Sequence, residues 1–136
     1  MAYKKLTIYT DGGARGNPGP AAIGVVIKHG AETIKEFGRY LGETTNNQAE
    51  YRALISGLEH CAELGAEEVE CMLDSELVVK QMNHQYRVKD ADLAPLFLKV
   101  YNLSQQFKKT TFHHIPREKN KEADKMVNDA LDRQIK

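Results

Sequence analysis

The N-terminal third of the chain alternates apolar and polar residues with a period of two, which is the pattern of half-buried β-strands. In residues 4–10 (KKLTIYT), leucine and isoleucine alternate with threonine and tyrosine, and residues 21–28 and 33–40 follow after short turns. The pattern predicts three sequential strands at the start of a sheet. Asp11 is expected to end the first strand, directly before a glycine-rich turn.

From Thr45 onward the apolar spacing changes to three and four residues, which is typical of a helix with one buried face. Thr45 is the expected N-cap, because Gln48 follows three positions later, and Gly65 is expected to end the helix. The buried face would carry Ala49, Ala53, Leu54, Gly57, Leu58, Cys61 and Leu64.

The rest of the chain predicts five more elements. They are a strand over 69–73, a short helix from Ser75, a helix capped by Asp92 after a polar loop over 83–92, a strand over 110–115 and a last helix from about Asn120. The order βββαβααβα indicates a mixed sheet with helices packed on it, an α/β class domain. No repeat, low-complexity tract or linker interrupts the pattern, so we expect a single domain over residues 1–136.

Composition limits the class of protein. The 136 residues are 41% hydrophobic, enough for one core, and 19 basic and 19 acidic side chains balance, which argues against binding nucleic acid through bulk positive charge. The longest apolar run, AAIGVVI, is too short to span a membrane, and the N-terminus lacks a signal-peptide core. We therefore expect a soluble, cytoplasmic protein with no membrane partner, in which Cys61 and Cys71 are reduced core residues.

Four acidic residues break the patterns around them. Asp11 and Asp74 each follow a predicted strand, where open α/β sheets place their active crevice, while Glu50 and Asp124 lie on the apolar stripes of their helices. Unpaired carboxylates that face a core are costly, and four that converge repel one another. A divalent cation would resolve both problems, and carboxylate oxygens suit Mg²⁺ or Mn²⁺ better than zinc.

Each of these residues also has an ordinary structural interpretation. Asp11 is a common turn former before two glycines, Asp74 can start the next helix, Glu50 can lie half-exposed at the edge of its stripe, and Asp124 can complement the helix dipole. Because the four lie on separate elements, at two strand ends and in two first helical turns, we favour a shared metal site.

The chain resembles the ribonuclease H type 1 family in four stretches that follow the family order and cover nearly its whole length. They are YTDGGARGNPGPAAIG, TTNNQAEYRAL, LDSELVVKQM and HHIPREKNKEADKMVNDAL. The resemblance implies a ribonuclease H-like fold, a five-stranded mixed sheet flanked by helices. It also implies two Mg²⁺ ions, with Mn²⁺ as a substitute and no organic cofactor, held by Asp11, Glu50, Asp74 and Asp124.

The activity that the resemblance implies is hydrolysis of the RNA strand of an RNA/DNA hybrid to 5′-phosphate and 3′-hydroxyl ends. Two metal ions about 3.5–4 Å apart can polarise an attacking water and stabilise the leaving oxygen without a covalent intermediate. If the ions neutralise four of the 19 acidic side chains, the 19 basic ones exceed the remainder by four, which favours a phosphate backbone.

Candidate substrate contacts lie in the first loop and at the start of the long helix. Amide side chains and free backbone N–H groups there can reach 2′-hydroxyls in a shallow minor groove, and the family uses matching asparagines in this way. Glycine allows close backbone approach, and arginine can contact phosphate. The alternative is that these residues only shape turns and a helix cap. They are Gly12, Gly13, Arg15 and Asn17 in the loop, and Asn46 and Asn47 in the helix.

Three features depart from the best-known bacterial form of the family. Arg117, in PREKN, replaces a histidine before the last carboxylate; this variant resembles the archaeal and Gram-positive subgroup, where the arginine takes a similar catalytic role. Glu76 stands where a substrate-binding glutamine is usual in the family, and it is a further candidate substrate contact. The long basic helix is replaced by residues 83–92, with only Arg87 and Lys89 basic, so we expect modest and salt-dependent affinity.

The sequence therefore predicts a Mg²⁺- or Mn²⁺-dependent ribonuclease H that cuts RNA/DNA hybrids with little sequence preference. Two alternatives stay open: a non-catalytic nucleic-acid-binding module with this fold, and a related polynucleotidyl transferase or junction resolvase. Some arginine-bearing relatives also cut double-stranded RNA, and the sequence leaves open whether this chain does so and which oligomeric state it adopts.

Overall fold

The computed structural model describes residues 3–134, whose helices and strands follow the predicted order βββαβααβα. A short 3₁₀-helix, η1 (Arg117–Lys119), precedes the last helix and was not predicted. The strands are β1 (Lys5–Ala14), β2 (Gly19–His29), β3 (Glu32–Thr44), β4 (Glu68–Leu73) and β5 (Lys109–His114). The helices are α1 (Asn46–Glu63), α2 (Glu76–Met82), α3 (Ala94–Ser104) and α4 (Lys121–Gln134).

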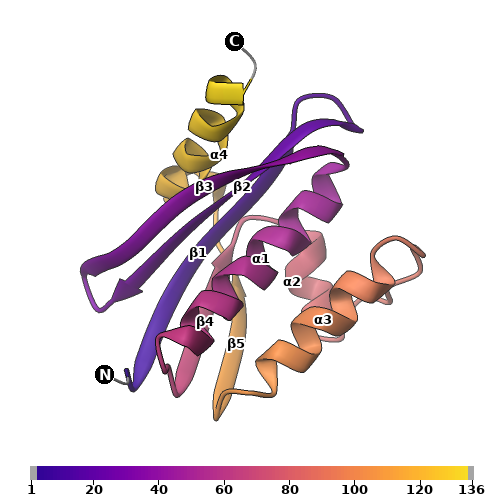
Figure 1. The fold of residues 1–136 in the computed structure, drawn as a ribbon. Coiled ribbons are helices and arrows are strands. Elements are labelled where there is room, and N and C mark those ends of the chain that lie inside the picture. Colours follow the sequence, from indigo (N-terminus) through magenta and orange to yellow (C-terminus); the bar gives the residue numbers. More distant parts are fainter. Residues whose placement is uncertain (1–2, 135–136) are drawn as a thin grey trace.

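The five strands form one mixed sheet in the order β3-β2-β1-β4-β5 (Figure 1). The first three strands pair antiparallel as consecutive hairpins, whereas β1 with β4 and β4 with β5 pair in parallel. β1 therefore lies at the centre, between an antiparallel half and a parallel half. The predicted α/β fold with a five-stranded mixed sheet is confirmed.

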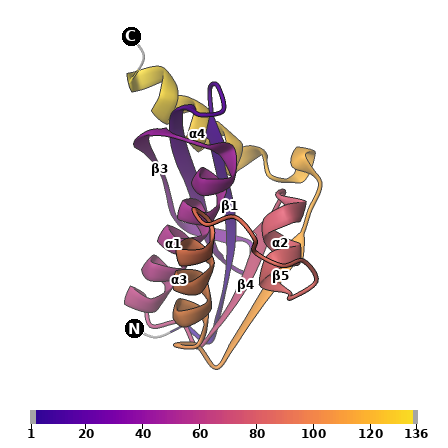
Figure 2. The same cartoon turned by 90° about the vertical axis from the view of Figure 1, so that its right-hand side faces the viewer.

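Helices pack on both faces of the sheet (Figures 1 and 2). On one face, α1, α2 and α3 share a large apolar core with β1, β2 and β4, and this core includes Cys61 and Cys71, both free and buried as predicted. On the other face, α4 packs on β2 through a smaller cluster. Within residues 3–134, no helix is both long and apolar enough to cross a membrane. The smaller cluster consists of Ala22, Val127, Ala130 and Leu131.

A glycine in β2 lets α4 lie very close to the sheet. A Cβ atom added at Gly24 would lie 2.0 Å from the carbonyl oxygen of Ala123, in the first turn of α4. The next residue, Val25, points to the opposite face, into the core under α1. A larger residue at Gly24 would push α4 away from the sheet, together with every side chain that α4 presents beside β1.

Both predicted ends of α1 are confirmed. The Thr45 hydroxyl accepts a hydrogen bond from the backbone N–H of Gln48 at 3.2 Å, as an N-cap does. At the other end, Gly65 has a left-handed backbone with φ 78°, and the N–H of Ala66 donates to the carbonyl of Cys61 at 3.1 Å. This is the glycine-dependent helix end that the sequence indicates.

Two predicted boundaries are wrong. β1 continues through Asp11 to Ala14, because β2 pairs with it over this whole stretch, so Asp11 lies inside a strand and not at its end. Asp92 does not cap α3. Leu93 holds the N-cap position without a side-chain bond, and the Asp90 carboxylate accepts the N–H of Asp92 at 2.7 Å in a turn before the helix.

Candidate active site

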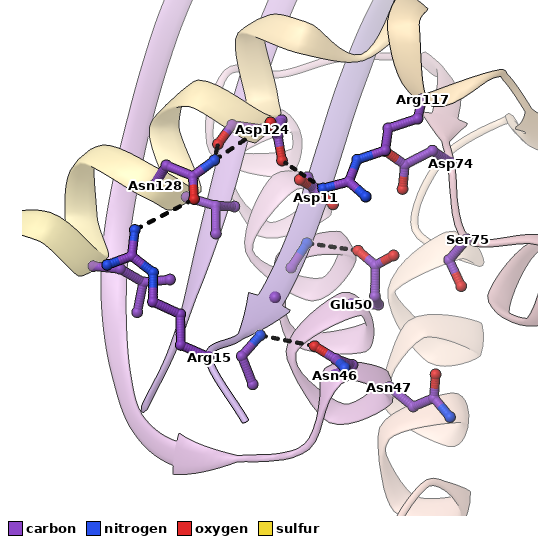
Figure 3. Close-up of a pocket in the computed structure, with 15 residues that line it drawn as sticks. Asp11, Arg15, Asn46, Asn47, Glu50, Asp74, Ser75, Arg117, Asp124 and Asn128 are labelled. Atoms are coloured by element: carbon purple, nitrogen blue, oxygen red, sulfur yellow. Dashed lines mark hydrogen bonds and ion pairs between the residues drawn. The ribbon is translucent and has the colours of Figure 1, made fainter. Parts of the chain in front are cut away.

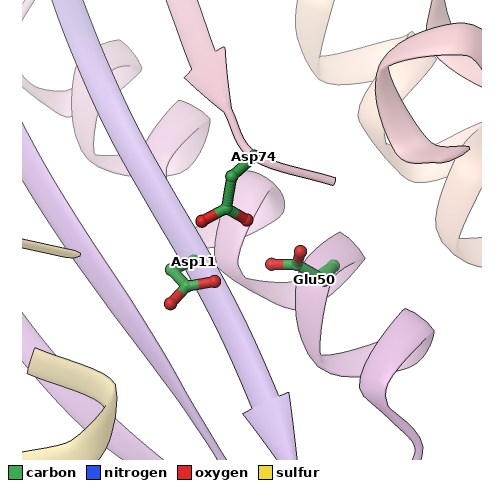
Figure 4. Close-up of side chains that lie close together, drawn as sticks. All are labelled: Asp11, Glu50 and Asp74. Atoms are coloured by element: carbon green, nitrogen blue, oxygen red, sulfur yellow. The ribbon is translucent and has the colours of Figure 1, made fainter. Parts of the chain in front are cut away.

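Three acidic side chains converge where β1, β4 and α1 meet. Asp11 comes from β1, Glu50 from the start of α1, and Asp74 directly follows β4. Each offers one carboxylate oxygen, and these three oxygens lie within 4.8 Å of one another (Figure 4). The structure therefore brings together three of the four carboxylates that the sequence singled out.

Strand pairing fixes the position of Asp11 beside Asp74. β1 and β4 are parallel neighbours, and their register pairs Thr10 with Leu73. Asp11 and Asp74 are the next residues along these strands, and here the strands separate, because β1 continues while Ser75 caps α2. The separation of two parallel neighbours at their carboxyl ends opens a crevice, as in other α/β sheets.

A close contact between β1 and α1 fixes Glu50. A Cβ atom added at Gly12 would lie 2.2 Å from the carbonyl oxygen of Ala49, so only glycine fits at this position. The backbone N–H of Gly12 donates to the Glu50 carboxylate at 2.5 Å. The glycine after Asp11 thus brings the helix close enough for Glu50 to join the carboxylates from the sheet.

The clustered carboxylates lie in surroundings that oppose their ionisation. Burial, followed by repulsion from Asp74, raises the pKa of Asp11 to about 8. Burial, followed by the charges of Asp11 and Asp74, raises the pKa of Glu50 well above its usual value, and burial also raises the pKa of Asp74. Close oxygen donors with too little positive charge around them fit a hard divalent cation such as Mg²⁺ or Mn²⁺.

Asp124 lies on the wall of the same site, in the first turn of α4 (Figure 3). Its Oδ1 lies 3.7 Å from Nη2 of Arg117, and its Oδ2 accepts a hydrogen bond from Asn128 at 3.4 Å. It is not one of the three acids whose oxygens cluster within 4.8 Å. The Arg117 side chain is 81% exposed, so this ion pair leaves the guanidinium accessible from the groove.

Sequence reasoning missed Asn120, which is buried behind the carboxylates. Its Nδ2 donates to the carbonyl of Thr10 at 2.9 Å and to Oδ2 of Asp74 at 3.3 Å, while its Oδ1 has no hydrogen-bond partner among residues 3–134. Asn120 also accepts the first backbone bond of α4, from Asp124, as an N-cap residue does. The sequence indicated only that the last helix starts near Asn120, because both side-chain partners lie far away along the chain.

An open groove of about 420 Å³ surrounds the carboxylates. Two predicted substrate residues do not line it. The Asn17 Oδ1 accepts the backbone N–H of Asn46 at 3.0 Å, and the Glu76 carboxylate lies 3.5 Å from Lys80. Asn17 therefore supports the start of α1, and Glu76 pairs along its own helix. The predicted residues that do line the groove are Gly12, Gly13, Arg15, Asn46, Asn47 and Arg117.

Comparison with known proteins finds close relatives. A family model described as Reverse transcriptase-like matches residues 9–130. Over 129 residues, the chain is 42% identical to Ribonuclease HI of Halobacterium salinarum, an alignment that covers 94% of this chain and 65% of that protein. Over 130 residues, it is 42% identical to the Bifunctional protein Rv2228c of Mycobacterium tuberculosis, covering 94% of this chain and 36% of that protein. The chain thus spans less than two thirds of either relative.

A solved structure is also similar to this chain, and the similarity extends over almost the whole of both chains. LC11-RNase H1, crystallised in complex with an RNA/DNA hybrid, superimposes with a TM-score of 0.92 and is 48% identical in sequence. The match covers 96% of this chain and 99% of that one. The fold, and not only the local motifs, is therefore shared.

Proposed function

This chain belongs to the ribonuclease H type 1 family, and from that premise we propose that it is a divalent-metal-dependent endoribonuclease that hydrolyses the RNA strand of RNA/DNA hybrids. The observation that carries the proposal is the convergence of Asp11, Glu50 and Asp74 within 4.8 Å in an open groove. The similarity to LC11-RNase H1, which was crystallised with such a hybrid, supports the choice of substrate.

We assign the metal ligands to Asp11, Glu50 and Asp74, with Asp124 completing the set from the facing wall. Two bound Mg²⁺ ions, or Mn²⁺ in their place, would polarise the attacking water and stabilise the leaving 3′-oxygen. The protein fixes the ligands in advance, because the Gly12 N–H holds the Glu50 carboxylate. This contact supports a site whose carboxylates would need little rearrangement to bind the ions.

Two further side chains act on this arrangement. Asn120 donates to the Asp74 carboxylate from behind and holds its orientation. Arg117 reaches the groove from η1 beside Asp124, where its N–H groups can donate to phosphate oxygens and offset the charge that builds up on them. Arg117 therefore acts on the substrate, whereas Asn120 acts through Asp74.

Recognition of the RNA strand falls to the start of α1 and the end of β1. The carbonyl oxygen of the Asn46 side chain accepts the N–H of Ala14 at 2.8 Å, which leaves its amide nitrogen to donate to a 2′-hydroxyl or a base edge. Asn47 lines the groove one residue later, and Gly12 and Gly13 leave room for the strand to approach the backbone. Asn17 contributes by holding Asn46 in place.

The test is a cleavage assay on one labelled sequence prepared as RNA/DNA hybrid, RNA/RNA, DNA/DNA and single strands, with Mg²⁺, Mn²⁺ or chelator. We expect metal-dependent cutting of the RNA strand of the hybrid, with 5′-phosphate and 3′-hydroxyl products. Added cutting of RNA/RNA would widen the substrate class. Cutting of duplex DNA would favour a resolvase-like enzyme, and no cutting by folded protein would favour a binding module.

A pair of aspartate variants ties the activity to the groove. Asp74→Asn removes one clustered carboxylate and should abolish cleavage of the hybrid. Asp129→Asn makes the same chemical change on the exposed side of α4, where Asp129 pairs with Lys125 at 2.9 Å, and should leave cleavage unchanged. Near wild-type cleavage by Asp74→Asn would refute the assigned ligand set.

A further inference from the structure

Arg15 lines the groove on the other side of the carboxylates from Arg117 (Figure 3). It is the first residue after β1, so its backbone is set by the same strand that carries Asp11. A nucleic-acid strand that crosses the carboxylates would therefore meet an arginine on each side of them. The mechanism above uses only Arg117.

The main chain around Arg15 is closely held. Its N–H donates to the carbonyl of Pro20 at 2.8 Å, across the short loop between β1 and β2. A Cβ atom added at Gly19 would lie 2.3 Å from the carbonyl oxygen of Arg15, so the two sides of the loop are in direct contact. The side chain of Arg15 therefore starts from a fixed point, and only its own rotation decides where the guanidinium lies.

In the free protein α4 holds that guanidinium. Nη2 of Arg15 lies 2.7 Å from Oδ1 of Asp132 and 3.5 Å from Oδ1 of Asn128. The ion pair is open to solvent, since the Arg15 and Asp132 side chains are 41% and 66% exposed, and ion pairs as exposed as this are weak. Asn128 is a neutral second acceptor, and it also donates to the carboxylate of Asp124.

We propose that Arg15 is a phosphate-binding residue of the groove and that Asp132 is its built-in competitor, which a phosphate of the nucleic-acid strand displaces. This inference rests on the proposed function, because it takes the polyanion in the groove to be the hybrid. Arginine N–H groups bond phosphate oxygens strongly, often two at a time, so the exchange replaces a weak exposed pair with a stronger one. Asn128 keeps the guanidinium at the groove wall while the exchange takes place.

Asp132 therefore lowers affinity in two ways. It occupies the Arg15 guanidinium, and its own negative charge lies beside the path of a polyanion. The first effect exists only while Arg15 is present, whereas the second acts in any variant. The two effects can therefore be separated by combining substitutions at both positions.

The experiment measures binding of a fluorescent RNA/DNA hybrid by anisotropy in chelator, so that no strand is cut, over a series of salt concentrations. Arg15→Ala should weaken binding about tenfold and reduce the slope of log K against log salt by about one. Asp132→Asn should tighten binding about two- to fivefold, which is what release of an exposed ion pair can supply. The same substitution in an Arg15→Ala background should give a clearly smaller gain, because only the effect of the Asp132 charge on the strand is then removed.

Matched variants control for charge and folding. Asp129→Asn removes the same charge from α4 without touching Arg15, and Arg39→Ala removes an exposed arginine from β3 outside the groove lining. Both should bind like the wild type. Arg15→Gln, which keeps most of the side chain, replaces Arg15→Ala if thermal melting shows that the alanine variant is unfolded.

Three results would overturn the inference: unchanged binding by Arg15→Ala, an Asp132→Asn gain no larger than that of Asp129→Asn, or an equal gain with and without Arg15. Cleavage of the hybrid by the wild type separates this failure from failure of the proposed function. If the wild type cuts and binds the hybrid while these variants show no coupling, only the inference about Arg15 fails. If the wild type neither cuts nor binds it, both fail.

Discussion

Replacing Asp11 by asparagine should make the metal-free protein more stable in neutral and mildly alkaline solution. The pKa of Asp11 is raised from 3.8 to about 8 by burial and by the neighbouring Asp74 charge. The folded protein therefore keeps a proton that the unfolded chain has already lost. Stability from a raised pKa is complete below the unfolded value and is lost as the pH rises toward the folded value, so it should fall between about pH 4 and pH 8.

The size of the effect follows from proton linkage. Each proton that the folded state retains and the unfolded state has lost lowers the free energy of unfolding by about 1.4 kcal/mol per pH unit. Between pH 5 and pH 8, one proton on Asp11 therefore costs about 4 kcal/mol of stability. Glu50, whose pKa is raised in the same direction, steepens the slope. Asparagine keeps the shape of the side chain but does not ionise. Asp11→Asn should therefore lose most of the pH dependence of stability that Asp11 contributes.

The assay is urea unfolding followed by circular dichroism in chelator at pH 5, 6, 7 and 8. Wild type, Asp11→Asn and the exposed control Asp129→Asn are compared, so that histidine titration cancels between them. The free energy of unfolding of the wild type should fall as the pH rises, and that of Asp129→Asn should fall in parallel. The free energy of unfolding of Asp11→Asn should change less with pH. At pH 8, added Mg²⁺ should raise the free energy of unfolding of the wild type far more than that of Asp11→Asn, because the ion takes the place of the proton on the Asp11 carboxylate. A wild-type curve that is flat from pH 5 to 8, or parallel curves for all three proteins, would refute the reasoning.

Three other substitutions test separate parts of the site. Arg117→Ala should lower kcat on the hybrid on the order of 10- to 100-fold while its Kd, measured in chelator, stays close to wild type; a change in Kd alone would contradict a role in the reaction. Asn120→Ala should lower the free energy of unfolding by about 1–3 kcal/mol, because the Thr10 carbonyl loses its buried donor. It should also weaken Mg²⁺ binding about tenfold, as measured by calorimetry, because Asp74 loses the hydrogen bond that orients it. Gly24→Ala should destabilise by about 1–3 kcal/mol in thermal melts, since its Cβ would strike α4, whereas Gly13→Ala, with its nearest contact at 3.7 Å, should melt close to wild type.

Much of the fold could be predicted because local patterns decide it. The order of elements, the Thr45 cap and the Gly65 helix end each depend on a few neighbouring residues. The end of β1 could not be predicted in this way. Gly12 and Gly13 carry no apolar or polar signal, and the strand continues there only because β2 pairs with it. The sequence therefore predicts the end of the strand at Asp11, three residues too early.

The residues of the candidate site also fall into those that local sequence patterns reveal and those that they do not. The acids were found because they interrupt patterns within their own elements, and the structure brings Asp11, Glu50 and Asp74 together. Asn120 was missed because its value lies in bonds to the carbonyl of Thr10 and to Asp74, which no local pattern reports. Single-residue roles that depend on contacts distant in the sequence remain outside the reach of sequence reasoning alone.

The walls of the groove come from residues far apart in the sequence, from β1 to α4, so the groove forms only when these elements have folded together. The bond between Arg15 and Asn128 spans 113 residues, and Asp124 faces the central strand only once α4 has packed on β2. A chain still being synthesised has β1, α1 and β4 available long before α4 can dock. The groove is therefore incomplete until α4 has been synthesised and has packed on the sheet, and a fragment that ends before α4 would lack one wall of the site altogether.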